Sequence, residues 1–405
     1  MRIGTPGYLL LLLSLSLACN TVQSAPPTGT SAEARVAATK DSWPLARGDQ
    51  QATGVARTAL PVKPQVLWKF TIPKSSVEST PAIVGGVVFI GDMQEKMYAL
   101  KLKTPQTTGE KLWEMPGELG FPGAPAVRDG KVYVGDGDGI FYCLQASDGK
   151  VVWKQPTEAE IVAGANFWNG NVLVGSQDSR LYCFNAESGE VVWKLQIENQ
   201  IRSFSTIVED RCFVMQCDGK LHVVDLNKGE IDSSVAIGQA NTTSSPAVLG
   251  DYLFFGTEEG AVLCVDWKNS KIAWTVEDKT ANSIRSSPAV MEGMVIVGTR
   301  GRRVNALDPS DGKELWSFAT KNKVDASPVI VGDYVLVGSS DGRIYLIDRK
   351  SGKEAWQYQC QGGINAGAAV ADGSFVVGTD RGIVYCFGMP EGVDDPKTPK
   401  LPRKE

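Results

Sequence analysis

Ser327-Pro-Val-Ile-Val-Gly-Asp-Tyr-Val-Leu-Val-Gly-Ser-Ser-Asp-Gly-Arg-Ile-Tyr-Leu-Ile-Asp-Arg-Lys-Ser-Gly-Lys-Glu-Ala-Trp356 is the unit from which most of this chain is built. Three runs rich in apolar and β-branched residues, Pro328–Val331, Tyr334–Val337 and Arg343–Ile347, are separated by turn residues such as Gly332-Asp333. A fourth run carries Trp356. The pattern predicts four antiparallel strands joined by tight turns.

The unit recurs with a nearly constant period. Tryptophan occupies its last position at residues 68, 113, 153, 193, 274, 316 and 356, and Ser233 stands where a further tryptophan is due. An eighth copy, Gly367–Phe387, has three strands but no tryptophan strand, whereas the run Val66–Phe70 has a tryptophan strand and no copy of its own. Repeats of about 40 residues with four strands each are typical of propeller blades. We therefore expect an all-β, eight-bladed β-propeller whose last blade is closed by the N-terminal strand.

The end of each unit resembles a known motif. Ala306-Leu-Asp308-Pro-Ser-Asp-Gly312-Lys313-Glu-Leu-Trp316 is similar to the tryptophan-docking motif A-x-D-x-x-T-G-K-x-x-W of pyrroloquinoline-quinone (PQQ)-type propellers, and the resemblance covers residues 66–388. It implies one of two branches. One comprises quinoprotein alcohol dehydrogenases, and the other comprises non-enzymatic relatives of the BamB type, which are lipoprotein scaffolds of the outer-membrane β-barrel assembly machinery. The motif specifies the fold but not the function.

The N-terminus predicts export. Residues 1–19 combine Arg2, the apolar run Tyr8–Leu17 and Cys19, as in a secretory signal whose apolar run is too short to span a bilayer. Leu15-Ser-Leu-Ala-Cys19 resembles a bacterial lipobox, which implies lipidation of Cys19. The alternative is ordinary signal-peptide cleavage close to Ala25. Both routes export the chain. With the lipid anchor we expect the protein in the cell envelope, facing the periplasm and attached to the outer membrane only through that anchor; without it we expect a soluble periplasmic or secreted protein.

Three further segments flank the propeller. Residues 20–42 are rich in Pro, Thr, Ser and Ala and are expected to form a flexible tether. Residues 43–65 begin with Trp43-Pro-Leu-Ala-Arg47 and are expected to pack on the disc as a leading segment. Residues 389–405 combine prolines with alternating charge and are expected to be disordered.

Composition excludes one class of partner. Forty-one Lys and Arg residues are scattered among 46 Asp and Glu residues, giving a formal net charge of −5. Nucleic-acid binding requires clustered basic residues, so no nucleic-acid partner is expected. The partners we expect are envelope proteins or unfolded outer-membrane protein segments, bound by a monomeric propeller.

Cysteine and histidine occupy packing positions. Four cysteines, at 143, 183, 264 and 386, stand where other copies have alanine, so they are expected to be small core residues. The disulfide state of the others within the propeller, Cys212, Cys217 and Cys360, does not follow from their spacing. The single histidine, His222, takes the place of a strand tyrosine, which favours a structural role over a catalytic one.

The resemblance leaves an enzyme as the alternative to a scaffold. The quinoprotein branch holds PQQ beside a disulfide between adjacent cysteines, together with a calcium ion and an Asp base, and this sequence has no Cys-Cys pair. We therefore expect no catalytic residues, cofactor or metal. The alternative is a PQQ- and calcium-dependent dehydrogenase or a related periplasmic enzyme that acts on sugars or alcohols.

The loops that lead into the blades suggest a partner-binding rim. The residue three positions before the start of each inner strand follows a mostly apolar residue, such as Val77 or Ile364, which should anchor the loop and free the next side chain. The charged and amide members of this ring are Glu78, Arg202, Arg285, Asp325 and Asn365. Arginines at such a rim bind carboxylates or carbonyl groups, and acidic residues bind cations. The alternatives are that these are ordinary solvated loop residues, or that a peptide or a loop of a partner protein binds at this rim.

Overall fold

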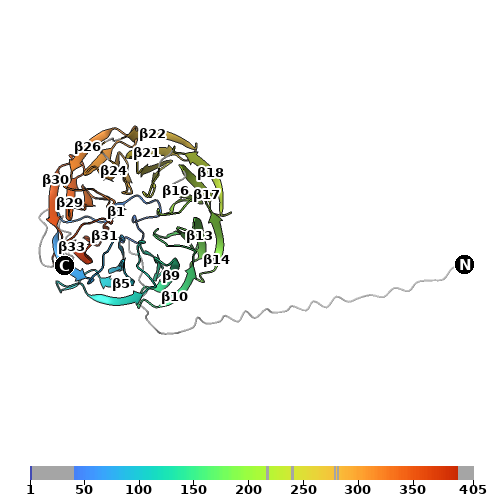
Figure 1. The fold of residues 1–405 in the computed structure, drawn as a ribbon, viewed down its shortest axis with the longest axis horizontal. Coiled ribbons are helices and arrows are strands. Elements are labelled where there is room, and N and C mark those ends of the chain that lie inside the picture. The colour runs from blue at the N-terminus through green and yellow to red at the C-terminus, as the bar shows by residue number, and fades with distance from the viewer. Residues whose placement is uncertain (2–40, 216–218, 239–240, 278–279, 281, 391–405) are drawn as a thin grey trace. The chain divides into compact units, whose positions relative to one another are not determined.

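The computed structural model describes residues 1, 41–215, 219–238, 241–277, 280 and 282–390. These residues form eight antiparallel sheets of four blade strands each, arranged around a central axis, and they contain no helix (Figure 1). The all-β, eight-bladed propeller predicted from the repeat is confirmed. The signal segment with Cys19, the tether up to residue 40, Cys217 and residues 391–405 lie outside the described residues. No helix in the described part is long and apolar enough to cross a membrane.

The blades follow one another along the chain, and each runs from an inner strand at the axis to an outer strand at the circumference. Blades 1 to 4 consist of β3 (Ala82–Val84), β4 (Val87–Gly91), β5 (Lys96–Lys101) and β6 (Lys111–Pro116); β7 (Ala126–Arg128), β8 (Lys131–Gly135), β9 (Ile140–Gln145) and β10 (Val151–Pro156); β11 (Asn166–Trp168), β12 (Asn171–Gly175), β13 (Arg180–Asn185) and β14 (Val191–Gln196); and β15 (Thr206–Val208), β16 (Arg211–Met215), β17 (Lys220–Asp225) and β18 (Glu230–Ala236). Blades 5 to 8 consist of β19 (Ala247–Leu249), β20 (Tyr252–Gly256), β21 (Ala261–Asp266) and β22 (Lys271–Glu277); β23 (Ala289–Met291), β24 (Met294–Thr299), β25 (Arg303–Leu307) and β26 (Glu314–Ala319); β27 (Val329–Val331), β28 (Tyr334–Gly338), β29 (Arg343–Asp348) and β30 (Glu354–Gln359); and β31 (Ala369–Ala371), β32 (Ser374–Gly378), β33 (Ile383–Gly388) and β2 (Gln65–Thr71).

The ring closes as the sequence predicts. Strand β2 lies antiparallel to β33, with Trp68 opposite Cys386, and so forms the outer strand of blade 8. Trp68 is fully buried, and its indole Nε1 donates a hydrogen bond to the carbonyl of Leu102 in blade 1 at 2.8 Å. The N-terminal strand therefore completes one blade and joins it to the next.

Tryptophans in the outer strands latch neighbouring blades together. In blade 1, Trp113 donates from Nε1 to the carbonyl of Ala146 in the turn between the third and fourth strands of blade 2, at 2.9 Å. Gly149 in that turn has φ of 73°, and a Cβ there would lie 2.7 Å from the Trp113 ring. Only glycine adopts this left-handed conformation readily and also admits the ring. The same indole-to-carbonyl contact recurs from Trp153, Trp193, Trp274 and Trp316.

The leading segment enters the central channel. Its backbone carbonyls accept hydrogen bonds from the central N–H of six inner strands, at 2.8–2.9 Å; the donors are Ile83, Val127, Ile207, Val248, Val290 and Ile330. Strand β1 (Val55–Ala56) then pairs parallel to β27, which gives blade 7 a fifth strand near the axis (Figure 1). An inner strand exposes one unpaired edge toward the axis, and the segment satisfies most of these edges. We call residues 43–57 the strap.

Arg47 anchors the strap. Its Nη2 donates to the carbonyl of Pro288 at 3.0 Å and to the carbonyl of Pro328 at 2.7 Å, which ties together blades 6 and 7. The side chain is 3% exposed, and burial lowers the pKa of Arg47 to about 10, although nearby Asp49 opposes the shift. The guanidinium therefore lies in the interior of the ring.

The sulfur and imidazole groups lie where the repeat predicts. The described cysteines are all buried and free: Cys143, Cys183, Cys212, Cys264, Cys360 and Cys386. Burial raises the pKa of Cys212 and of Cys360 to about 12, so neither thiol is poised as a nucleophile. His222 is 4% exposed, and its Nδ1 lies 2.8 Å from the Ser234 hydroxyl in the neighbouring strand. These positions confirm the packing roles predicted for the four alanine-slot cysteines and favour a structural role for His222.

Candidate functional site

The predicted rim lies on one face of the disc. We call this face the rim face, because it carries the hairpins between the second and third strands and the loops between blades. Each loop is held by a buried apolar residue: Ile284 donates its backbone N–H to the carbonyl of Thr257 at 2.8 Å, and its side chain covers Gly256. A Cβ at Gly256 would come within 2.1 Å of that side chain, so the glycine allows the close contact. Corresponding anchors are Val77, Phe121, Ile161, Ile201, Val324 and Ile364.

The rim residues that follow these anchors are mostly paired with the hairpin of the preceding blade. Arg285 contacts Glu258, with 2.9 Å between Nε and Oε1. Asp325 accepts two hydrogen bonds from Arg300, at 2.8 and 3.0 Å. The Asn365 side-chain oxygen accepts a hydrogen bond from Ser340 at 2.6 Å. The geometry therefore brings together hairpin and loop residues that are far apart in the sequence.

These pairs change the electrostatics of the predicted ring. Asp325 also lies 2.7 Å from the ammonium of Lys323, so two cations face a single carboxylate. Burial acts to raise the pKa of Asp325, but the hydrogen bonds from Arg300 and Lys323 outweigh it, and the net shift is downward. Asp325 is therefore held as a carboxylate within a local ion pair. It does not contribute the unpaired negative charge that the loop sequence suggested.

Two rim residues remain directed toward solvent. Glu78 is exposed, and its carboxylate accepts one long hydrogen bond from Ser76 at 3.4 Å. Arg202 is exposed, and its Nη2 donates to the side-chain oxygen of Gln200 at 2.6 Å. Of the five predicted rim residues, these two retain charges without an ion pair among the described residues. They belong to the loops that enter blades 1 and 4.

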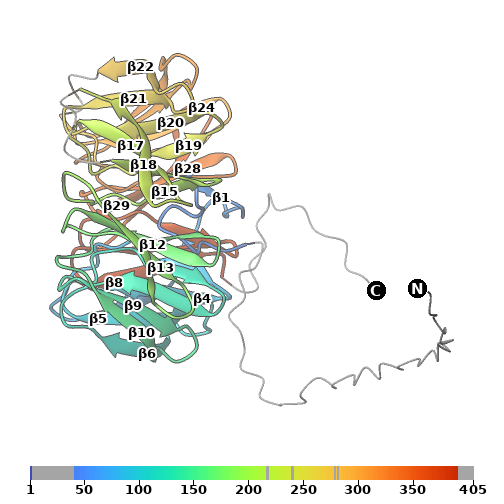
Figure 2. The same ribbon diagram turned by 90° about the vertical axis from the view of Figure 1, so that its right-hand side faces the viewer.

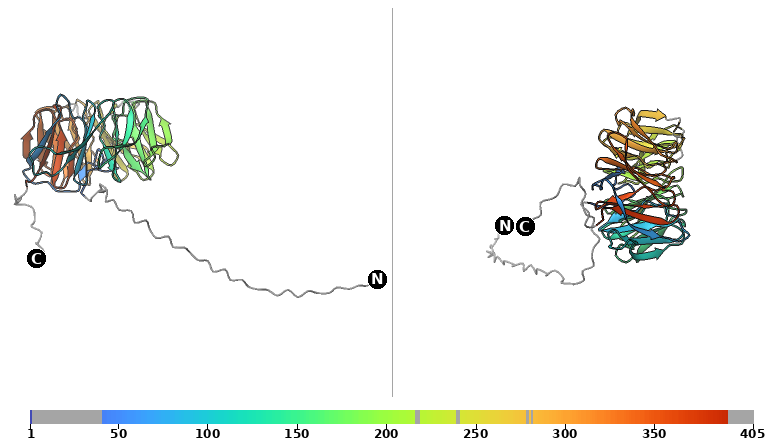
Figure 3. Two further views of the ribbon diagram at one scale, coloured as in Figure 1. Left: turned by 90° about the horizontal axis from the view of Figure 1, so that it is seen from below. Right: turned by 90° about the vertical axis from the view of Figure 1, so that its left-hand side faces the viewer.

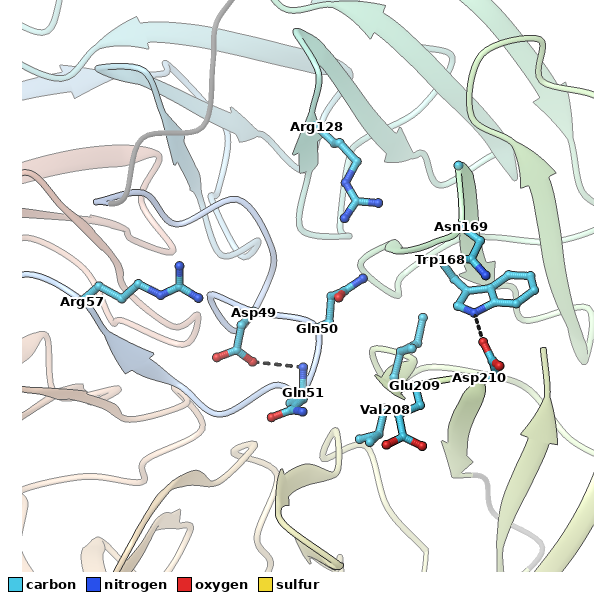
Figure 4. A pocket seen from close by; sticks show the side chains of 12 residues that line it. Asp49, Gln50, Gln51, Arg57, Arg128, Trp168, Asn169, Val208, Glu209 and Asp210 are labelled. Carbon is cyan, nitrogen blue, oxygen red and sulfur yellow. Dashed lines mark hydrogen bonds between the residues drawn. The ribbon is translucent and has the colours of Figure 1, made fainter. Parts of the chain in front are cut away.

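A pocket on the opposite face was not predicted from the sequence. It measures about 680 Å³ and lies where the strap crosses the hairpins between the first and second strands of blades 3 and 4. Figure 4 shows Gln50 and Gln51 of the strap in its middle, with Arg57 and Arg128 entering from two sides. Trp168 forms one wall, and its indole Nε1 donates to Asp210 at 2.9 Å. The lining is polar and carries charges of both signs.

The internal repeat contains a signal for this pocket. The last residue of the inner strand is aliphatic or methionine in six blades, whereas blades 2 and 3 have Arg128 and Trp168 there. Comparing that one position across the copies would have singled out both residues. Arg57 and the strap glutamines could not be found in this way, because the strap has no counterpart in the repeat. Their placement depends on how the leading segment crosses the channel.

The residues present do not match the donor set that a quinoprotein site uses. No two cysteines are adjacent in the sequence, and the cysteines seen in the structure are buried in separate blades. Within the described ranges no three His, Cys, Asp or Glu side chains are grouped so that they could hold a metal ion. Near the axis, Arg47 and the strap backbone occupy the inner strand edges.

The comparison with protein families defines the class. The family model described as outer membrane protein assembly factor BamB matches residues 103–288 and 273–392, which together make up more than half of the chain. The chain therefore belongs to this family of PQQ-repeat propellers. It is also 33% identical over 104 residues to the quinohemoprotein alcohol dehydrogenase ADH IIB of Pseudomonas putida. That match spans 22% of this chain and only 15% of the enzyme.

Solved structures from both branches share the fold. BamB from Moraxella catarrhalis superposes with a TM-score of 0.65 at 15% identity, covering 82% of this chain and 99% of that one. A europium-containing methanol dehydrogenase superposes with a TM-score of 0.74 at 13% identity, covering 86% of this chain and 98% of that one. At these identities the similarity establishes the fold alone.

Proposed function

We propose that this protein is an exported, non-enzymatic propeller scaffold that binds protein partners in the cell envelope, as BamB-type proteins do in outer-membrane protein assembly. The observation that carries the proposal is the strap that covers the inner strand edges. Its backbone carbonyls accept hydrogen bonds from six inner strands, and the buried Arg47 side chain bridges Pro288 and Pro328. A propeller whose inner strand edges are covered by its own chain offers its faces and loops for binding.

The location follows from the N-terminal sequence. We propose that the signal segment directs export and that Cys19 is lipidated, which would hold the propeller at the periplasmic side of the outer membrane. The residues from 20 to 42 would then let the disc reach partners near the membrane. Labelling cells with a radioactive or clickable fatty acid tests this part: wild-type protein should incorporate it, whereas Cys19→Ala should not.

The partner surface that we propose is the rim face, with Arg202 and Glu78 as its accessible charges and Arg285, Asp325 and Asn365 as paired members. Replacing both Arg202 and Arg285 with alanine should weaken partner binding, and more so at low salt, where charges are less screened. The test is affinity capture of envelope proteins by purified wild-type and variant propellers at low and high ionic strength. Lys194→Ala, on the outer strand β14, is the matched control.

A double variant that captures the same proteins at wild-type strength at every salt concentration would remove the rim face from the proposal. The melting temperature should stay close to that of the wild type, since both side chains are exposed. A large drop in melting temperature would mean that any weaker capture by the double variant results from loss of folded protein and not from the missing arginines. In that case Arg202→Gln alone is the appropriate variant, because Arg202 has no ion pair among the described residues.

The enzyme remains the second candidate because of the 104-residue similarity to a quinohemoprotein alcohol dehydrogenase. Its test is direct: purified protein is mixed with PQQ and calcium, and dye reduction is followed with alcohols and aldoses. Turnover above the protein-free control would favour the dehydrogenase and overturn the scaffold proposal. We expect no turnover.

A further inference from the structure

Two arginines in the pocket opposite the rim face carry charges that no ion pair neutralises among the residues the structure describes. Arg128 is half-buried and stacks over the Phe167 ring, with 4.5 Å between its guanidinium carbon and the ring centroid. Burial lowers the pKa of Arg128, although Asp129 opposes the shift. Arg57 is exposed. Among the described residues neither guanidinium has a carboxylate within ion-pair distance, so both remain available to an anion.

Three carboxylates, Asp49, Glu209 and Asp210, also line the pocket, and two of them accept hydrogen bonds from neighbouring residues. Asp49 accepts hydrogen bonds from the backbone N–H groups of Gln51 and Thr53 at 3.0 and 3.1 Å, and also from the Thr53 hydroxyl. Asp210 accepts the Trp168 indole N–H, which lowers the pKa of Asp210. Only Glu209 has no hydrogen bond or ion pair in the described part of the chain. Figure 4 places it across the pocket from Arg128.

The pocket also offers groups that suit a peptide backbone. Gln51 and Asn169 are exposed and present side-chain amides, which can both donate and accept hydrogen bonds. The Trp168 ring is held in place by Asp210 and is partly exposed, so it forms a flat wall. A volume of about 680 Å³ is large enough for several residues of an extended chain. Guanidinium groups bind carboxylates in a two-pronged geometry.

We propose that this pocket binds an acidic segment of a partner protein, with Arg57 and Arg128 binding its carboxylates and Gln51 and Asn169 binding its backbone. Glu209 determines the orientation of the bound segment, because its negative charge repels the acidic side chains of the ligand toward the two arginines. This inference rests on the proposed scaffold function, and it adds a second binding surface with a defined ligand chemistry.

The experiment is calorimetric titration of the purified propeller with short capped peptides. One peptide carries two glutamates among glycines and serines, and its partner carries two glutamines instead. We expect the glutamate peptide to bind and the glutamine peptide not to bind. Arg128→Gln and Arg57→Gln should each weaken binding by about tenfold, the scale of a lost charge-assisted contact. Glu209→Gln should strengthen it, because a repulsive charge is removed.

Lys194→Gln, which removes a positive charge from the outer strand β14, is the matched control and should leave binding unchanged. Melting curves show whether each variant is folded. Should Arg128→Gln fail to fold, Arg57→Gln still decides, because Arg57 is exposed. A third arm titrates glutarate, a free dicarboxylate, which we expect to bind much more weakly than the peptide.

Any one of four results would overturn the proposal. The first is that the glutamate peptide does not bind, and the second is that the glutamine peptide binds as tightly as the glutamate peptide. The third is that neither arginine variant weakens binding, and the fourth is that glutarate binds as tightly as the peptide and so defines a small-molecule site. The titration uses a synthetic ligand and the capture experiment uses envelope proteins. If no peptide binds in the titration, the pocket proposal fails and the scaffold function stands. If the wild-type propeller captures no envelope protein, the scaffold function fails, whereas the titration still measures whether the pocket binds acidic peptides.

Discussion

Trp267 of blade 5 packs against Phe213 of blade 4, with ring centroids 5.2 Å apart and planes at 63°. Elsewhere the corresponding strand phenylalanine is covered from its own blade, as Phe89 is by Trp113 at 5.9 Å. Blade 4 has Ser233 at the tryptophan position, and Ser270 replaces the turn glycine that would have faced it. Trp267 occupies the turn position whose carbonyl accepts the indole in other blades. Between blades 4 and 5, the usual latch from a tryptophan of the preceding blade is thus replaced by a contact from a tryptophan of the following blade.

This substitution predicts a specific weakness. Trp267→Ala should destabilise the propeller by about 2 kcal/mol, because a partly buried aromatic pair is lost at a blade junction that has no docking tryptophan. Thermal melting followed by circular dichroism measures the effect. Adding Ser233→Trp and Ser270→Gly to the same variant should recover most of the loss, since it rebuilds the usual latch. If the triple variant melts no higher than Trp267→Ala, the two arrangements are not equivalent.

Ring closure by β2 predicts a stepwise response to truncation. Removing residues 1–40 should leave melting unchanged, whereas removing residues 1–71 should lower the melting temperature strongly. The second truncation exposes the edge of β33 and removes the Trp68 contact with Leu102. Removing residues 1–64 keeps β2 but deletes the strap, and it should give an intermediate value. Unchanged cooperative melting after the loss of residues 1–71 would contradict closure by this strand.

Buried tyrosines predict a loss of stability at alkaline pH. Four of them donate their hydroxyl to a hairpin carboxylate, at 2.6–3.1 Å; they are Tyr98, Tyr142, Tyr182 and Tyr345. Burial, followed by the bond to Asp178, raises the pKa of Tyr182 to about 12. Above about pH 10 the unfolded chain loses phenolic protons that the folded protein keeps, so the folded state binds more protons and stability falls as pH rises.

The measurement for this prediction is the melting temperature between about pH 8 and pH 11. The variant with all four tyrosines replaced by phenylalanine should show a shallower alkaline decline than the wild type. Tyr252→Phe, at an exposed tyrosine on β20, is the matched control and should leave the slope unchanged. Equal slopes in all three proteins would show that other groups dominate the alkaline transition.

The fold could be predicted from the sequence because each blade repeats the same local rules. Turn glycines, alternating apolar residues and the position of Trp68 were sufficient to give the blade number and the closing strand. The compensation by Trp267 could not be predicted in this way. It depends on packing between two blades that both depart from the repeat.

The candidate sites were only partly predictable. The loop anchors and the positions of the rim residues follow from periodicity, but the pairing of Arg285 with Glu258 and of Asp325 with Arg300 joins residues about 25 positions apart through blade geometry. The path of the strap was not predictable, since residues 43–57 match no repeat. Its hydrogen bonds with six inner strands join backbone groups, which leave little trace in the sequence.

The last prediction compares Gly54 of the strap with Gly86, which lies in the hairpin between β3 and β4 of blade 1. Gly54 has φ of 66°, and a Cβ there would lie 2.1 Å from Nη2 of Arg47. Gly86 has φ of 75°, with nothing within 4 Å of the Cβ position. Gly86→Ala should therefore cost only the backbone strain, about 1 kcal/mol. Gly54→Ala has the same strain and also displaces Arg47 from Pro288 and Pro328, so it should detach the strap. The melting temperature should fall further for Gly54→Ala, and trypsin should cut after Arg47 and Arg57 much faster than in Gly86→Ala. Equal cleavage rates in the two variants would mean that Arg47 does not hold the strap in the channel.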